Sequence, residues 1–569
     1  MATYYVSKST ANASLGYVVG NDSNAGTSPA TAWLTLAKIT ASAADGDTVY
    51  VNDGTYTDAE LGGSNVFSLN STKSIKMYPV TDYGVTLQST AASAQLVSLT
   101  GTATNEMIFG KFIIDGEIPG APGTYQPTGM VLPNPSNQAV ITLSGTRFQN
   151  CATQNILNSK RRGTLNMTGV QFAGLMAQGV ASTASGADVA SMTVAVDGLA
   201  LQDVTTSSNA LTRVLDFTRL SSSSNTYTLT VSGVTGTITA PAALGSSAAV
   251  ALLVATGIDG VIAEEFDATY YAYNTGATCY GIYIKNASRG ATATANRPII
   301  RHNRIVGNAP SEYVISAGDT TTAYDVDAAQ VYGNTITVPY YASATPHAVA
   351  VGNVTGGTVW GNWINGSYVA ILLGINQGAA VTGNVSVGCY GMCLYAKGCG
   401  ATTAPIIANN TVILTDTYGA ARGGALAVAV QGATNNTAVT FQNNNVYAYT
   451  DMYRYTDVGT SQTATFVKNN YYSAGPAGFT SPWSYQSSTY TTFATWQAAR
   501  ETTGTNVDPI MVNVLAGDYR LHAPSTLRHS GAPWGVRAVD YRGRQCWDRP
   551  DIGAYYSSSG DPAPARTAR

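Results

Sequence analysis

Charged side chains are scarce in this sequence. Lys, Arg, Asp and Glu make up 11% of its 569 residues, against about 25% in an average globular protein. The formal net charge is only −3, which argues against binding nucleic acid or an anionic membrane as the main function. Hydrophobic residues still reach 44%, so the chain can bury a large core and is not a disordered polyelectrolyte.

Cysteine is also sparse. The six residues are Cys151, Cys279, Cys389, Cys393, Cys399 and Cys546, too few for a disulfide framework in a chain of this length. The short spacing from Cys389 to Cys399 superficially suggests a metal site, but no His lies near it. Buried core thiols are therefore expected, with no metal site and no cofactor.

Long apolar runs are missing as well. The most apolar stretch, residues 242–258, is interrupted by Gly245, Ser246 and Ser247, whereas a membrane-spanning helix needs about 20 consecutive apolar residues. We expect a buried strand there and no membrane insertion. The first residues, Met1-Ala-Thr-Tyr-Tyr-Val, include neither the basic nor the apolar region of a signal peptide, so none is expected.

Short polar residues take the place of the missing charge, and a repeated pattern runs through the second half. The pattern is an apolar residue, two residues, Asn, one residue, and usually a second apolar residue. Its seven Asn positions lie 22 to 34 residues apart: Asn303, Asn334, Asn362, Asn384, Asn410, Asn444 and Asn469. A looser version in the first half has Gly at the corner: Gly110, Gly145, Gly169, Gly198 and Gly233.

Each repeat indicates a strand, a tight corner and a second strand. Asn and Gly tolerate left-handed backbone angles at a corner, and stacked Asn amides stabilise repeated parallel layers. A coil of this length cannot bury its own apolar face, so successive coils must stack. The prediction is an all-β fold, a single-stranded right-handed parallel β-helix. We divide it into residues 1–60 (N-terminal cap and first coil), 61–475 (coils) and 476–569 (C-terminal closing coil and tail).

Both ends of the chain strengthen this prediction. Residues 4–56 contain Gly20-Asn-Asp-Ser-Asn-Ala-Gly and Asp45-Gly-Asp-Thr-Val-Tyr-Val, and this series resembles the opening of pectate-lyase-like right-handed β-helix proteins. The resemblance implies a capping helix over residues 35–44 and a first core strand over residues 47–51. Residues 492–500 indicate a second short helix, and the following segments are similar to the terminal coil of that superfamily.

The superfamily includes enzymes that act on polysaccharides, but their catalytic motifs are absent from this sequence. Only Tyr283-Ile-Lys285 is loosely similar to one polygalacturonase segment, so no catalytic set is transferred. From the residues themselves, Asp325 and Asp327 are the first candidates, with Glu312 from the preceding coil. At positions i and i+2 of a strand, two carboxylates share a face about 7 Å apart, which fits inverting glycoside hydrolysis. The alternative is a solvated surface pair.

Aromatic and arginine side chains are candidates for binding sugars. Tyr340, Tyr341, Trp360 and Trp363 offer rings for stacking, with packing between coils as the alternative. Arg301 and Arg304 are candidate partners of the substrate. Nine of the twenty Arg lie in residues 500–569, where we expect them to pair with local carboxylates or with a partner subunit.

The functional expectation is a phage virion protein of tailspike or fibre type, made in the host cytoplasm. It would bind host cell-surface polysaccharide, contact other virion proteins and form a homotrimer, as β-helix tailspikes do. The alternatives are a polysaccharide hydrolase or lyase, a capsid or tail decoration protein, and a bacterial surface adhesin. Low charge disfavours a dense catalytic site, so the expectation favours binding over catalysis.

Overall fold

The computed structural model describes residues 1–62, 67–71, 73–90, 96–101, 106–121, 123–125, 129–132, 140–159, 163–184, 192–208, 210–219, 226–245, 247–273, 278–285, 297–318, 326–341, 345–352, 354–374, 378–398, 403–415, 426–431, 438–449, 454–460, 462–474, 483–533, 538–542, 545–546 and 550–555. The chain forms two compact units. The N-terminal unit comprises Met1–Pro298 with Arg304–Ser311, and the C-terminal unit comprises Ile299–Asn303 with Glu312–Arg569.

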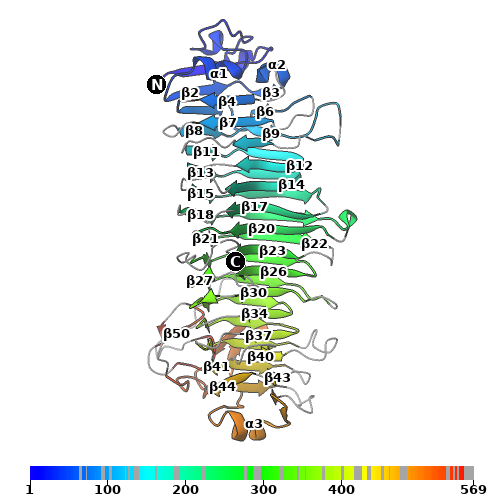
Figure 1. The fold of residues 1–569 in the computed structure, drawn as a ribbon, viewed down its shortest axis with the longest axis vertical. Coiled ribbons are helices and arrows are strands. Elements are labelled where there is room, and N and C mark those ends of the chain that lie inside the picture. Colours follow the sequence, from blue (N-terminus) through cyan, green and yellow to red (C-terminus); the bar gives the residue numbers. More distant parts are fainter. Residues whose placement is uncertain are drawn as a thin grey trace. The chain divides into compact units, whose positions relative to one another are not determined.

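In the N-terminal unit, three series of parallel strands are stacked coil upon coil (Figure 1). The first series contains β1 (Thr3–Val6), β2 (Asp47–Val51), β5 (Ile75–Pro79), β8 (Glu106–Gly110), β11 (Val140–Ser144), β13 (Gly163–Thr168), β15 (Met192–Asp197), β18 (Tyr227–Ser232) and β21 (Gly260–Glu264). The second contains β3 (Gly54–Tyr56), β6 (Val85–Leu87), β9 (Ile113–Asp115), β12 (Arg147–Ser159), β14 (Gln171–Ala184), β16 (Ala200–Thr206), β19 (Thr235–Ala240), β22 (Asp267–Ala272) and β25 (Arg304–Asn308). The third contains β4 (Phe67–Ser71), β7 (Val97–Gly101), β10 (Met130–Leu132), the far halves of β12 and β14, β17 (Leu211–Arg219), β20 (Ala249–Thr256) and β23 (Cys279–Lys285).

The C-terminal unit repeats this arrangement. Its first series contains β24 (Ile299–Arg301), β28 (Gln330–Tyr332), β32 (Thr358–Trp360), β35 (Ala380–Thr382), β38 (Ile406–Ala408), β41 (Ala438–Gln442) and β44 (Thr463–Val467). The second contains β29 (Thr335–Val338), β33 (Trp363–Gly366), β36 (Val385–Val387), β39 (Thr411–Leu414), β42 (Asn445–Ala448) and β45 (Asn470–Ser473). The third contains β26 (Glu312–Ala317), β30 (His347–Gly352), β34 (Val369–Gly374), β37 (Met392–Lys397), β40 (Leu426–Gln431), β43 (Arg454–Val458) and β46 (Trp483–Tyr485).

The remaining elements are short. In the N-terminal unit they are η1 (Ala13–Leu15), η2 (Pro29–Thr31), α1 (Ala37–Ser42), α2 (Asp58–Leu61) and η3 (Ala242–Leu244). In the C-terminal unit they are β27 (Val326–Asp327), β31 (Val354–Thr355), β47 (Ser488–Tyr490), α3 (Phe493–Arg500), β48 (Met511–Asn513), η5 (Val514–Ala516), β49 (Asp518–Leu521), β50 (Ala538–Val539) and β51 (Gln545–Cys546).

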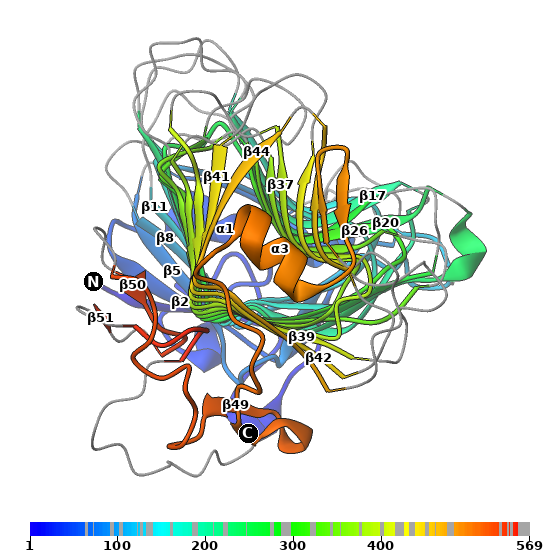
Figure 2. The ribbon, with the colours of Figure 1, turned by 90° about the horizontal axis from the view of Figure 1, so that it is seen from below.

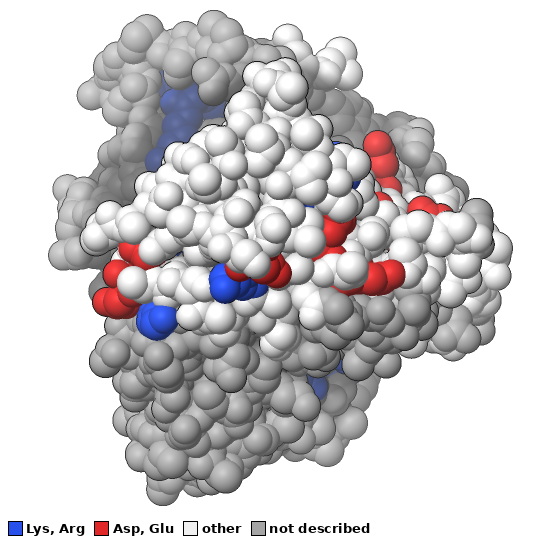
Figure 3. All heavy atoms as spheres, turned by 90° about the horizontal axis from the view of Figure 1, so that it is seen from above, with Lys and Arg blue, Asp and Glu red and all other residues white. Residues whose placement is uncertain are grey.

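These series confirm the predicted all-β parallel β-helix. Each strand pairs in parallel with the strand one coil away, as β13 does with both β11 and β15. Burial alternates along β18, where Tyr227, Leu229 and Val231 face inward. Of the stretch 242–258 predicted as a buried strand, residues 249–256 form β20, all of which is buried, whereas residues 242–244 form the short helix η3, which has no buried residue. On the face shown in Figure 3, few charged groups lie among the described atoms.

In the C-terminal unit, the seven predicted Asn residues form one continuous buried ladder. Each amide Nδ2 donates to the Oδ1 of the next Asn at 2.8–3.0 Å. That Oδ1 also accepts the backbone N–H of the preceding Asn at 2.9–3.1 Å. The predicted ladder is thus confirmed, but the left-handed corner belongs to the residue before each Asn: His302, Gly333, Gly361, Gly383, Asn409, Asn443 and Lys468.

In the N-terminal unit, left-handed corners lie at four of the five predicted glycines, Gly145, Gly169, Gly198 and Gly233. The fifth prediction, Gly110, is wrong. The corner falls one residue later, at Lys111 with φ 63°, because Gly110 still belongs to strand β8. The residue after the corner faces inward, and it is apolar in most coils: Phe112, Val170, Leu199, Val234 and Phe266.

Both predicted helices are present. Helix α1 lies within predicted residues 35–44, and β2 matches the predicted first core strand. Helix α3 begins after its N-cap Thr492, whose hydroxyl accepts the N–H of Thr495. Figure 2 shows α3 at the end of the C-terminal unit, where Trp496 is fully buried and its ring lies 5.0 Å from that of Phe466.

Candidate functional site

The third strand series of the N-terminal unit presents its outer side chains in an unusual pattern. In β17, Val214 and Leu215 are consecutive and both fully buried, so inward and outward positions do not simply alternate. The half-exposed residues on either side, Arg213 and Asp216, are therefore three positions apart. The same interruption of the inward–outward alternation continues in β20 and β23, because Arg213 pairs with Ala251 and Ala251 pairs with Tyr280.

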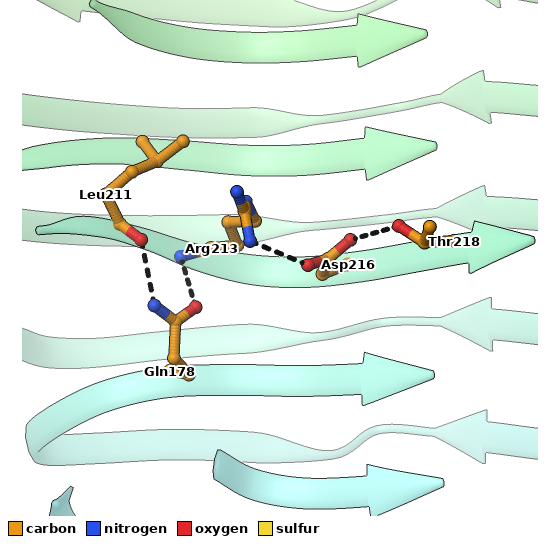
Figure 4. Close-up of polar contacts among 5 residues, drawn as sticks. All are labelled: Gln178, Leu211, Arg213, Asp216 and Thr218. Atoms are coloured by element: carbon orange, nitrogen blue, oxygen red, sulfur yellow. Dashed lines mark hydrogen bonds and ion pairs between the residues drawn. The ribbon is translucent and has the colours of Figure 1, made fainter. Parts of the chain in front are cut away.

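Arg213 and Asp216 form an ion pair on this outer face (Figure 4). The guanidinium Nη1 lies 3.1 Å from Asp216 Oδ2, and the Thr218 hydroxyl donates to Asp216 Oδ1 at 3.0 Å. Gln178 on β14 holds the neighbouring backbone, since its Oε1 accepts the N–H of Arg213 and its Nε2 donates to the carbonyl of Leu211. The pair is thus held in place from two strands.

Two coils further along the series, β23 carries an aromatic pair on the same face. The rings of Tyr280 and Tyr283 stack with centroids 4.4 Å apart and an interplanar angle of 16°. The ammonium of Lys285 lies 5.3 Å from the Tyr283 ring centroid, which is cation–π distance. Stacking on one another holds both rings in place.

Strand β20 runs between these two rows and carries shorter side chains. Ala251 pairs with Arg213 and Tyr280, and Val254 pairs with Asp216 and Tyr283. Adjacent strands are about 4.8 Å apart, so the two rows are about 10 Å apart. We call this surface the β20 trough: Arg213, Asp216 and Thr218 on one side, Tyr280, Tyr283 and Lys285 on the other. Ala251 and Val254 lie between them and are 0% and 6% exposed, so the two rows, and not β20 itself, form the accessible surface.

The chemistry of the β20 trough is that of a sugar-binding surface. The Asp216 carboxylate can accept hydrogen bonds from sugar hydroxyl groups, and the Arg213 guanidinium beside it can donate hydrogen bonds to them. Tyrosine adds a ring with an apolar body and a polar tip. The sequence prediction missed this surface. The sequence pattern that could have indicated it is two consecutive buried residues between two outward residues, as in Arg213-Val-Leu-Asp216 and Tyr280-Gly-Ile-Tyr283.

The predicted carboxylates do not meet in one described site. Asp325 lies outside the described residues, and for Asp327 only the backbone, in β27, is described. Val326 between them is fully buried, as expected for an inward side chain. Glu312 begins β26 and is 1% exposed, so it is not a surface carboxylate open to a polysaccharide.

Two predicted sugar-binding residues, Arg301 and Trp360, share one outer column with Tyr332. Strand register places Tyr332 between them. Arg301 Nη1 donates to the Tyr332 hydroxyl at 3.2 Å, and the Trp360 ring stacks on Tyr332 with centroids 4.4 Å apart. This column lies on the first strand series of the C-terminal unit.

The predicted tyrosines Tyr340 and Tyr341 lie at a different place, against Tyr390. The rings of Tyr340 and Tyr390 meet edge to face at 4.8 Å. The Tyr390 hydroxyl accepts the backbone N–H of Tyr341 at 3.3 Å. These contacts are packing contacts within the C-terminal unit.

Trp363 and Arg304 also have protein partners. The Trp363 ring stacks on Tyr519, with centroids 5.6 Å apart, and lies 5.8 Å from Tyr541. Arg304 forms an exposed ion pair with Asp267, Nη1 to Oδ1 at 2.7 Å. For Trp363 this is the packing role that we set beside sugar stacking.

Among the cysteines that the structure describes, Cys151, Cys279, Cys389 and Cys393 are buried, as expected. Burial raises the pKa of the Cys151 thiol to about 12, which makes it a poor nucleophile at neutral pH. Within the described ranges, no group of three His, Cys, Asp or Glu side chains is placed to hold a metal ion. In the same part of the chain, no helix has the length and apolarity to cross a membrane.

Comparison with known proteins gives structural similarity alone. No protein-family model and no curated protein matches the sequence. Similar solved structures include a mannuronic-acid-specific family 6 polysaccharide lyase from human gut microbiota, with 11% identity, TM-score 0.32 and coverage of 90% of this chain and 92% of the lyase. Pectate lyase Pel9A has 12% identity, TM-score 0.23 and coverage of 98% and 97%. XylC in complex with xylose has 8% identity, TM-score 0.29 and coverage of 97% and 98%. At these values the similarities carry no information about the site.

Proposed function

We propose that this protein binds a polysaccharide through the β20 trough. The observation that carries the proposal is the pairing of two different rows on one outer face. Arg213 and Asp216 form a polar row, and Tyr280 and Tyr283 form an aromatic row two strands away. Polar groups orient sugar hydroxyls while ring surfaces cover apolar C–H faces, so the two rows can act on one sugar chain.

The rigidity of the trough favours binding. Its side chains project from β17 and β23, which both pair in parallel with β20 between them, and each row is held by internal contacts before any ligand arrives. A preorganised surface loses less conformational entropy on binding than a mobile loop does. The low charge of the chain suits ligands recognised by hydroxyl groups rather than by charge alone.

The test is binding of purified capsule and lipopolysaccharide to the immobilised protein, measured by biolayer interferometry. Replacing Tyr283 by Ala is expected to weaken binding about tenfold, because it removes one ring and the partner of Tyr280. Tyr50→Ala is the matched control, since Tyr50 is also an outer stacked tyrosine of the N-terminal unit but lies on β2. Equal binding by wild type and Tyr283→Ala would overturn the assignment of the site.

Cleavage of the bound polysaccharide is the alternative, and the prediction of Asp325 and Asp327 as its carboxylates is open to the same experiment. New reducing ends or unsaturated sugars in the incubation would show catalysis. If activity is found and survives in the double variant Asp325→Asn, Asp327→Asn, those two residues are not the catalytic pair. Their removal should leave binding at the β20 trough intact.

The biological setting in this proposal is a phage virion, with the protein as a tailspike or fibre-type trimer that contacts a host surface and other virion proteins. The repeated parallel coils support it, because such coils present a long, regular binding face. Mass spectrometry of purified virions tests the location, and absence of the protein there would contradict it. Light scattering after size exclusion tests the trimer, for which three times the 59.0 kDa chain mass is expected.

A further inference from the structure

The C-terminal unit contains a polar hollow, formed where the chain folds back along its own coils. Its enclosed volume is about 90 Å³, and it is lined by Gly517, Asp518, Arg520, Tyr541, Arg542 and Tyr555. Pockets that enclose a small molecule usually measure about 300–1,000 Å³. The hollow is therefore too small to enclose a whole sugar and can take only part of one ligand.

The walls are fastened to the coils by hydrogen bonds at the left-handed corners. Asn409 Nδ2 donates to the carbonyl of Asp551 at 2.8 Å, and the N–H of Gly553 donates to the carbonyl of Asn443 at 2.7 Å. The backbone carbonyl of Tyr541 lies against Gly361, where a Cβ atom would meet it at 3.3 Å. The hollow is thus part of the folded unit.

One of the two arginines in the hollow is already neutralised. Arg520 donates from Nε to Asp518 Oδ1 at 2.7 Å and also pairs through Nη2 with Oδ2. This contact, with a smaller contribution from Arg542, lowers the pKa of the Asp518 carboxyl. Asp518 is therefore ionised and balanced by Arg520. Arg542 is exposed, and among the described lining residues its charge leaves a positive balance.

Aromatic rings complete the hollow. Tyr541 and Tyr555 have ring centroids 5.5 Å apart at an interplanar angle of 59°. Behind them, Trp363 contacts Tyr541 and Tyr519. A cation beside two tilted rings matches a ligand with a carboxylate at one end and an apolar ring face at the other.

We infer that this hollow binds a single acidic sugar, its carboxylate at Arg542 and its ring face against Tyr541 and Tyr555. An Arg guanidinium matches a carboxylate bidentately, and the rings cover C–H groups that the charge cannot recognise. The Asp518 carboxylate disfavours a more highly charged anion such as phosphate. The inference stands on residues of the C-terminal unit and does not depend on the β20 trough.

Ligand-observed saturation-transfer NMR on the full chain tests the site, with sodium glucuronate, glucose and inorganic phosphate as probes. We expect glucuronate to bind at least about tenfold more tightly than glucose, because only glucuronate carries the carboxylate. Arg542→Gln should weaken glucuronate binding by about the same factor. Since Arg542 is exposed, the variant should keep the wild-type unfolding temperature.

Arg500→Gln is the matched control. Arg500 also lies over a tyrosine ring, that of Tyr485 at 4.0 Å, but it belongs to α3 and does not line the hollow. Unchanged glucuronate binding in Arg500→Gln, together with loss in Arg542→Gln, would support the inference. Absence of glucuronate binding to the wild type, full binding by Arg542→Gln, or equal binding of phosphate would each overturn it.

Discussion

The two units build the same corner with different chemistry. In the N-terminal unit the inward residue after the corner is mostly apolar, as at Val170, Leu199 and Val234, and these side chains are 0–1% exposed. In the C-terminal unit Asn occupies that place in seven successive coils and is buried to the same degree. The backbone path is shared, since a left-handed residue precedes the position in both units.

In each unit the inward residues after the corner form a column with one residue per coil, and the two columns are stabilised in different ways. An apolar side chain is stabilised by leaving water, coil by coil. A buried amide is tolerated only when its hydrogen-bonding groups have partners. Asn384 meets this condition, because its Nδ2 donates to Asn410 Oδ1 and the Val359 carbonyl while its Oδ1 accepts twice from Asn362.

The comparison teaches that the Asn column is collective, whereas the apolar column is local. Each Asn depends on both neighbours, so the ladder also needs a suitable end. That end is Glu501, whose Oε1 accepts from the backbone N–H and Nδ2 of Asn469 at 2.7 and 2.9 Å. In the N-terminal unit, Thr146 occupies the same position after the corner and makes only one such hydrogen bond, from its hydroxyl to the Phe109 carbonyl.

The largest expected effect comes from replacing one Asn of the ladder by an apolar residue of the kind that the N-terminal unit has at this position. Asn384→Val leaves Asn362 with two buried donors unpaired and removes a donor from Val359 and Asn410. At about 1–3 kcal/mol for each unsatisfied group, with partial relaxation, we expect a loss of about 4 kcal/mol in the free energy of unfolding. Urea unfolding followed by circular dichroism measures it.

The control for this variant is Asn365→Ala, because Asn365 is exposed in β33. Its stability should change by less than about 0.5 kcal/mol. A loss under about 1 kcal/mol for Asn384→Val would show that the rungs are independent of one another.

The reverse exchange is expected to cost less. Val170→Asn places one amide in the apolar column, between Leu199, which offers no hydrogen-bonding group, and Thr146, whose hydroxyl already donates to the Phe109 carbonyl. Loss of valine burial and desolvation of the amide together predict about 3 kcal/mol. The same urea experiment measures it, with exposed Thr168→Asn as control. A neutral result would mean that a single Asn finds partners without a ladder.

The smallest effect concerns the end of the ladder and depends on pH. Burial raises the pKa of Glu501 to about 7, even though Asn469 donates to its carboxylate. The folded state therefore holds this proton more tightly than the unfolded state does, and stability falls as pH rises from the unfolded value toward about 7. This group alone should make the protein about 2 kcal/mol less stable at about pH 8 than at about pH 5.5.

Glu501→Gln removes the titrating group and should flatten that part of the pH dependence. Urea midpoints at both pH values provide the measurement. Asn365→Ala retains Glu501 and should keep the wild-type slope. An unchanged slope in Glu501→Gln would show that the end of the ladder does not titrate in this range.

The ladder could be predicted because its signal is local and repeated. An Asn that recurs once per coil between apolar residues has few explanations other than stacking. The β20 trough could not be predicted in the same way, since Arg213 and Tyr280 are brought together only by the register of β17, β20 and β23. The hollow at Arg542 depends on a chain reversal, with Asn409 and Asn443 holding Asp551 and Gly553.

By itself, the sequence determined the repeated coil and the buried Asn ladder, because both arise from contacts between a residue and its own repeat. The N-terminal capping helix was expected from a family resemblance and not from the repeat. Only the tertiary structure decided which outer side chains meet. Two buried neighbours such as Val214 and Leu215 shift the outward positions, and the returning C-terminal segment covers Trp363 with Tyr519 and Tyr541. Outer contacts depend on the register between distant coils, which no local pattern specifies.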